Sequence, residues 1–89
     1  MPGIVRVGDT DTGHGKYGPT AATEGSPDTN VNGKAVHRVG DALAAHEHSR
    51  VSGCGSPDVF VNSKAVVRIG DCVACGGVFV TGSSDTIIN

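Results

Sequence analysis

Large side chains are scarce in this chain. Among its 89 residues there are no tryptophans, one tyrosine and two phenylalanines. A chain of this length buries only roughly 60–65% of its unfolded surface. The sequence also lacks an apolar run of about 18 residues, which argues against a membrane-spanning helix. It lacks the charged and then apolar start of a signal peptide, so any export is expected to use another route.

A strong charge of one sign is absent as well. The net charge is −2, with both signs mixed along the chain, so no basic surface for nucleic acid is indicated. Three cysteines, an odd number, cannot form a complete disulfide framework. Small scaffolds with thin cores need a metal, disulfides or oligomerisation for stability. The composition therefore favours a single small domain with a staple of one of these kinds.

A long internal repeat is present instead. Residues 25–41 read GSPDTNVNGKAVHRVGD and residues 55–71 read GSPDVFVNSKAVVRIGD, which agree at twelve of seventeen positions with an offset of 30 residues. Residues 4–9 repeat the end of this unit, and residues 82–89 repeat its beginning. Two complete units and two half-units predict three quasi-equivalent units within one domain over residues 1–89.

The repeated unit predicts a β-hairpin. Asn32-Gly33 lies between apolar residues, which is the strongest short hairpin signal because both turn positions favour positive φ. Asn62-Ser63 is its counterpart and fits this turn less well. We expect hairpins over 29–39 and 59–69, and half-strands over 3–8, 78–81 and 85–88. The segment ALAAHEH forms at most one turn of helix, so the predicted class is all-β, small and irregular.

The segments between the units carry the candidate metal ligands. Every cysteine, and every histidine except His37, lies in the non-repeating connectors 10–24, 42–54 and 72–81. If three hairpins surround an axis, these connectors converge at one end. Histidine and cysteine are the preferred ligands of tetrahedral zinc. The favoured set is His14, His46, His48 and Cys75. His37 stands where the other copy has Val67, and we expect it to be a structural hairpin residue.

The choice among these residues depends on local geometry. His46 and His48 reach one metal only if 46–48 is extended, because residues i and i+2 then share a face. Cys75 is favoured as the thiolate because two glycines follow it and let the backbone turn sharply. Cys72 is the first alternative and Cys54 the next, although both lie beside a repeated unit and look closer to scaffold.

An enzymatic interpretation is weaker. Aspartates recur at the start and end of every unit, as structural Asx turns would, and a catalytic pair would not be triplicated; they are Asp9, Asp28, Asp41, Asp58, Asp71 and Asp85. A zinc hydrolase needs three protein ligands and an open water position, whereas four candidates close the shell. The C-x-x-C pair of Cys72 and Cys75 lacks the βαβ context of a thioredoxin-like redox motif.

The repeats, the histidine-containing connectors and the final C-GG-x-x-x-x-GS segment resemble the PAAR-repeat proteins over essentially the whole chain. The Pro-Ala-Ala-Arg motif itself is altered to KAVHR at 34–38 and KAVVR at 64–68. The resemblance implies a short cone of β-hairpins with one structural zinc near its vertex. Three histidines and one cysteine bind that zinc in the family, which implies His14, His46, His48 and Cys75 here.

The resemblance also implies a function. PAAR proteins cap the trimeric β-helical spike (VgrG) of type VI secretion systems, or the central spike of phage tails, and sharpen it for piercing a membrane. One chain per trimer, assembled in the cytoplasm and then delivered outside the cell or carried in a virion, is expected to present a roughly three-fold base. Candidates for its core or base are Val31, Val36, Phe60, Val61, Val66 and Ile87. A cargo adaptor on the spike and a small zinc or redox enzyme are the alternatives.

Overall fold

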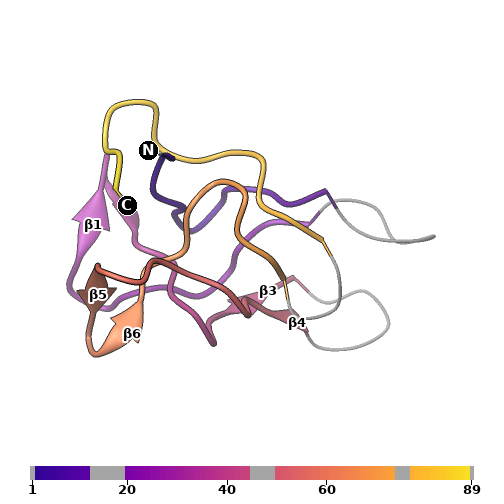
Figure 1. Cartoon of the computed structure of the whole chain (residues 1–89), viewed down its shortest axis with the longest axis horizontal. Helices are drawn as coiled ribbons and strands as arrows, with labels where there is room; N and C mark the ends of the chain where they lie inside the picture. Colours follow the sequence, from indigo (N-terminus) through magenta and orange to yellow (C-terminus); the bar gives the residue numbers. More distant parts are fainter. Residues whose placement is uncertain (1, 13–19, 45–49, 74–76, 89) are drawn as a thin grey trace.

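The computed structural model describes residues 2–12, 20–44, 50–73 and 77–88. Within these ranges there is no helix, and the six strands form three antiparallel pairs. They are β1 (Asn30–Val31) with β2 (Lys34–Ala35), β3 (Ala42–Leu43) with β4 (Arg50–Val51), and β5 (Phe60–Val61) with β6 (Lys64–Ala65). Isolated β-bridges link these pairs to one another. The predicted all-β class is confirmed (Figure 1).

The two complete units form the predicted hairpins. Their turn residues have positive φ, at 54° and 78° for Asn32 and Gly33 and at 53° and 65° for Asn62 and Ser63. The paired strands are shorter than expected, with only two residues on each side of a turn. The reason is that the chain leaves each hairpin to pair with another unit, as in the bridge between Arg38 and Val66.

The centre of the molecule is a closed ring of three backbone hydrogen bonds. Val5 donates its N–H to the carbonyl of Val67, Val67 donates to His37, and His37 donates to Val5, over 2.9, 3.1 and 3.0 Å. All three side chains are fully buried. Because each of these residues belongs to a different unit, the ring marks a quasi-three-fold axis through the single chain.

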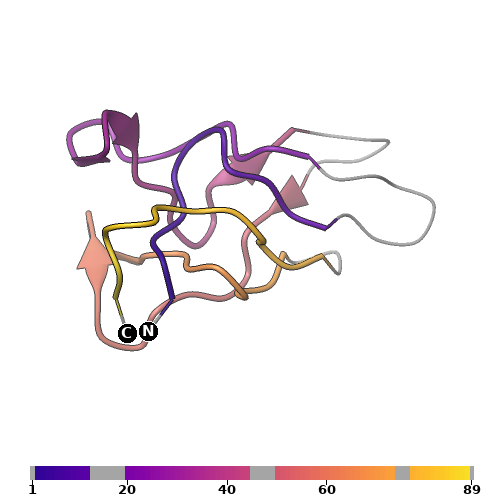
Figure 2. The ribbon, with the colours of Figure 1, turned by 90° about the horizontal axis from the view of Figure 1, so that it is seen from above.

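The two half-units together form the third unit. Ser83 N donates to the carbonyl of Ile4 over 2.8 Å, as Ser26 N and Ser56 N donate to Val36 and Val66 over the same distance. A further bridge joins Gly3 and Ile87. The beginning and end of the described chain therefore lie side by side (Figure 2). The same hydrogen bond therefore occurs within each of the three units, although one unit is split in sequence.

The core residues separate from the exposed ones along each hairpin. Val36 and Val66 are buried, and Val31 and Val61 pack against them. Phe60 and Ile87, by contrast, are 58% and 49% exposed. The six residues predicted to form the core or the base therefore include both core and surface positions.

A second buried cluster joins the central ring to the connectors and comprises Val5, Ala22, Leu43, Val67, Val73 and Phe79. Its Leu43 belongs to the segment ALAAHEH. Ala42 and Leu43 pair as a strand with Val51 and Arg50, so the possible helical turn does not include them.

Candidate functional site

The three connectors begin at equivalent places around the axis. One residue in the later part of each connector donates its N–H to the carbonyl of the aspartate that ends the preceding unit: Ala22 to Asp9, Ser52 to Asp41 and Phe79 to Asp71, over 2.9, 3.2 and 3.0 Å. All three of these connector residues are buried. Ala22 and Phe79 pack in one cluster with Val5 and Val67, and Ser52 is hydrogen-bonded to His37, so these residues form a layer next to the central ring.

A further layer leads toward the predicted metal ligands. Bridges join Asp11 to Phe79, Leu43 to Ala22 and Val73 to Ser52, and the first-named residue of each pair is buried. In sequence, His14 follows Asp11 by three residues, His46 follows Leu43 by three, and Cys75 follows Val73 by two. The described ends of the connectors gather at one end of the molecule, opposite β1 and β5 (Figures 1 and 2).

The four predicted ligands, His14, His46, His48 and Cys75, lie outside the described residues. Within the described ranges, no group of three or more His, Cys, Asp or Glu side chains is placed to hold a metal. Three imidazoles and one thiolate are a donor set that zinc accepts in structural sites. The connectors that carry this set all leave one buried layer of the described structure.

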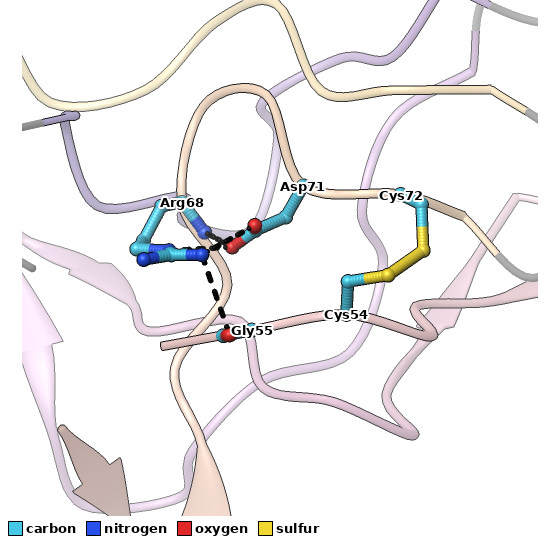
Figure 3. Close-up of a disulfide and its surroundings, with 5 residues drawn as sticks. All are labelled: Cys54, Gly55, Arg68, Asp71 and Cys72. Carbon is cyan, nitrogen blue, oxygen red and sulfur yellow. Dashed lines mark hydrogen bonds and ion pairs between the residues drawn. A yellow bond between two sulfur atoms is a disulfide. The ribbon is translucent and has the colours of Figure 1, made fainter. Parts of the chain in front are cut away.

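Cys54 and Cys72 are joined by a disulfide, with their Cα atoms 5.2 Å apart and a sequence separation of 18 (Figure 3). This bond corrects the interpretation of both residues as alternative metal ligands, since a disulfide sulfur is not a thiolate. Sequence reasoning missed the pairing. Its signal was positional, because Cys54 directly precedes one repeated unit and Cys72 directly follows it.

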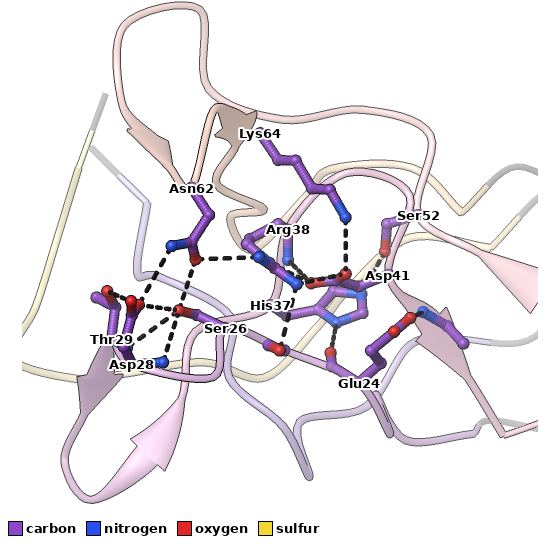
Figure 4. A network of polar contacts seen from close by, with 12 residues as sticks. Glu24, Ser26, Asp28, Thr29, His37, Arg38, Asp41, Ser52, Asn62 and Lys64 are labelled. Carbon is purple, nitrogen blue, oxygen red and sulfur yellow. Dashed lines mark hydrogen bonds and ion pairs between the residues drawn. The ribbon is translucent and has the colours of Figure 1, made fainter.

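His37 lies on the axis with both ring nitrogens in hydrogen bonds. Nδ1 is 2.7 Å from the Glu24 carbonyl oxygen, and Nε2 is 2.6 Å from Ser52 Oγ (Figure 4). A carbonyl can only accept, so Nδ1 carries the proton and the Ser52 hydroxyl donates to Nε2. The ring also contacts Phe79, with centroids 5.4 Å apart. Burial lowers the pKa of His37, which keeps the ring neutral and gives it the structural role that the sequence predicted.

The aspartates that end the units are held by arginines three residues earlier. Arg38 Nε and Nη2 donate to Asp41 over 2.7 and 2.9 Å, and the Arg68–Asp71 pair repeats this fork over 2.8 and 2.7 Å. Arg6 and Asp9 form the third copy. Although burial opposes ionisation of Asp9, hydrogen bonds from Arg6 outweigh it and lower the pKa of Asp9. These carboxylates are structural ion pairs.

The aspartates that open the units act differently from the predicted Asx turns. The serine two residues earlier forms the turn, because Ser26 Oγ accepts from the backbone N–H of Asp28 and Thr29 over 3.2 and 3.0 Å. Asn62 of the neighbouring unit donates to the Asp28 carboxylate and accepts from Ser26 Oγ (Figure 4). Hydrogen bonds from Asn62 and Ser26 lower the pKa of Asp28.

The same contact joins the first unit to the split unit. Asn32 donates to Asp85 over 3.0 Å and accepts from Ser83 Oγ over 2.8 Å. An arginine completes each cluster, with Arg6 Nη1 and Arg38 Nη1 donating to Asn32 and Asn62 over 3.0 Å in both. Turn asparagines thus connect successive units at the end of the molecule away from the connectors.

Three quasi-equivalent β-units around a closed axis, with connectors converging at one end, define a small trimer-like β-domain built from one chain. The model of the PAAR motif family matches residues 7–81, and the chain belongs to this family. Among curated proteins, no sequence match is found. Family membership supports a structural role at the spike tip of a type VI or phage-related injection machine, in association with a VgrG-type spike.

The described part of the chain contains no helix that is long and apolar enough to cross a membrane.

Proposed function

We propose that this chain caps a trimeric VgrG-like spike, one chain per trimer, and that one zinc ion stabilises the opposite vertex. The observation that carries the proposal is the equivalence of Asn30, Phe60 and Ile87. Each precedes a half-buried apolar residue of its unit, namely Val31, Val61 or Ile88, and each is exposed. A three-fold partner offers three identical surfaces, and a single chain can meet them only with three equivalent positions of its own.

The vertex zinc is proposed from the connectors. His14, His46, His48 and Cys75 would hold the ion, which would cross-link three segments beyond the point where the buried layers end. Structural zinc in small peptides contributes on the order of 10 kcal/mol of apparent binding free energy. A narrow tip has no room for a comparable apolar core, so the metal would supply the stiffness that the tip needs.

The mechanism is mechanical. A contracting sheath would drive the capped spike from the cytoplasm, where the chain assembles, into a target membrane that it contacts transiently. Zinc would act as a structural ion with a closed ligand shell. The arginine and aspartate side chains of the units are engaged with each other, which fits a structural role better than catalysis. A cargo protein bound to the outer surface is the second candidate role.

Metal content and melting test the vertex. The untagged protein is expected to contain about one zinc per chain, and its melting temperature should fall sharply after treatment with a strong chelator. Replacing His46 by alanine should give the same loss without chelator. A metal-free protein whose melting does not respond to chelator would contradict the ligand assignment.

Binding to a purified trimeric VgrG-like spike tests the base. Phe60→Asp should weaken binding at least tenfold, because it places a charge in an apolar contact. Val80→Asp is the matched control, since Val80 is 50% exposed but belongs to a connector. It should bind normally, with one chain per trimer by light scattering. Normal binding by the Phe60 variant together with loss in the Val80 variant would show that another face docks.

A further inference from the structure

Three equivalent junctions close the three units, and each joins the residue before the start of a unit to the residue after the end of the same unit. Thr81, Glu24 and Cys54 each precede the glycine that opens a unit, and Thr10, Ala42 and Cys72 each follow the aspartate that ends one. At the first junction, Thr10 N donates to Thr81 Oγ1 over 2.8 Å. At the second, Ala42 N donates to Glu24 Oε1 over 3.0 Å. At the third, the two side chains form the disulfide (Figure 3).

The third junction also has the backbone contacts that the second junction makes without a disulfide. Gly53 N donates to the carbonyl of Cys72 over 3.1 Å, as Thr23 N donates to that of Ala42 over 3.0 Å. Ser52 and Val73 form a β-bridge beside it, as Ala22 and Leu43 do. Two junctions thus close with hydrogen bonds between the same positions. The third has the backbone contacts to close without a covalent bond.

We infer that the disulfide between Cys54 and Cys72 is an oxidation-dependent lock added to a fold that also closes with both thiols reduced. Part of this inference rests on the proposed function, because delivery would carry the chain from a reducing cytoplasm to an oxidising exterior. On this view the disulfide forms after delivery, when the folded chain is in use, and is not needed for folding in the cytoplasm.

The chemistry of closure is thiol–disulfide exchange with a low-molecular-weight disulfide. Cys54 is exposed and Cys72 is half-buried, so the Cys54 thiolate is the one that such a reagent reaches first. It attacks one sulfur of the reagent and releases one thiol. The Cys72 thiolate then attacks the Cys54 sulfur of this mixed disulfide and releases the second thiol. Two protein thiols are oxidised, and one reagent disulfide is reduced to two thiols.

The position of the bond gives it an effect on the vertex. Cys54 ends the connector that carries His46 and His48, and Cys72 begins the connector that carries Cys75. Closure ties the bases of these two connectors together. It also leaves Cys75 as the remaining cysteine, so oxidation removes two competing thiolates from the neighbourhood of the predicted ligands.

Melting of the wild-type protein in two redox states tests the lock. Oxidised glutathione should remove two free thiols per chain and raise the melting temperature by roughly 10 °C or more relative to protein kept in a phosphine reductant. Circular dichroism spectra should agree between the two states. Unfolding upon reduction would overturn the inference, because the bond would then be required for the fold. Equal melting temperatures, or thiols that do not pair, would also overturn it.

The chain provides its own control variant. Cys54→Thr with Cys72→Thr copies the junction of Thr81 and Thr10, in which a threonine hydroxyl accepts the backbone N–H. This variant should melt like the reduced wild type and should not respond to glutathione. If oxidised glutathione also raised the melting temperature of this variant, the increase in the wild type would come from a group other than these two cysteines.

The inference and the proposed function fail separately. Zinc content and spike binding are measured on the same oxidised and reduced samples. A redox-dependent melting temperature in a protein that binds neither zinc nor a spike would leave the lock standing and remove the proposed function. The reverse result would remove the lock alone.

Discussion

Replacing His37 by valine tests how the axis is built, because Val5 and Val67 hold the same place in the other two units. The variant makes the central ring uniform in sequence. It also removes the partner of Ser52 Oγ and a hydrogen bond to the Glu24 carbonyl. Comparison of the three equivalent positions alone would predict that valine leaves the stability unchanged or increases it. The contacts in the structure predict the opposite.

The expected loss follows from these contacts. Two hydrogen bonds contribute about 0.5–1.5 kcal/mol each, and the smaller side chain leaves a gap beside Phe79 that costs roughly another 1 kcal/mol. His37→Val should therefore lower the free energy of unfolding by about 2–4 kcal/mol at pH 8, measured by urea denaturation. Adding Ser52→Ala removes the unpaired hydroxyl and should restore about 1 kcal/mol, since Ala22 fills the equivalent position in another unit.

The pH dependence separates the histidine from simple packing. Burial lowers the pKa of His37 in the folded protein, whereas the unfolded chain titrates near its ordinary value of about 6.5. The unfolded state therefore binds more protons in acid. The stabilising effect of neutral His37 is complete above about pH 6.5 and declines below it, by at most about 1.4 kcal/mol per pH unit.

The other histidines are common to both proteins, so the difference between their stabilities isolates His37. That difference should shrink as the pH falls from 8 to 5. Equal stability at pH 8, or a constant difference across this range, would refute the account of a neutral, doubly hydrogen-bonded ring on the axis.

Two other predictions concern the hairpin turns. Ser63 has a φ of 65°, which costs a side-chain-bearing residue about 1 kcal/mol, so Ser63→Gly should stabilise the protein by about that amount in urea denaturation. Gly33→Ser should destabilise the protein by a similar amount. A change of the same sign in both variants would refute the argument. Asn62→Ala removes a hydrogen bond that lowers the pKa of Asp28, so NMR titration should show this pKa rising toward its usual value. An unchanged titration curve would show that other contacts maintain the shift.

Much of the fold could be predicted because its signals are local. The offset between the two units and the Asn32-Gly33 turn specify a hairpin within a few residues of sequence. The half-units at the two ends carry the same signature, and the structure joins them through Ser83 and Ile4. Family membership was likewise visible in the repeats and connectors before any contact was known.

The remainder depends on contacts between units. The pairing of β3 with β4 lies in a connector with no repeat and no turn signal, so no local sequence pattern predicts it. The disulfide needed the knowledge that Cys54 and Cys72 occupy a junction. The ligand set of His14, His46, His48 and Cys75 lies outside the described residues and stays a prediction.

A single chain with internal three-fold equivalence can do what a homotrimer cannot, which is to vary one copy at a time. The units agree closely in the asparagine contacts between them, at the end of the molecule where the proposed three-fold partner would require equivalent surfaces. They diverge in the interior, where Ala22, Ser52 and Phe79 occupy one layer. His37 reaches toward the last two of these residues, so a polar partner and a large ring compensate for an unusual residue on the axis. The same freedom allows one junction to carry a disulfide while the others carry hydrogen bonds. The three-fold equivalence is kept at the end that would contact the spike. The disulfide and the proposed metal ligands belong to the connectors, where the units differ in sequence.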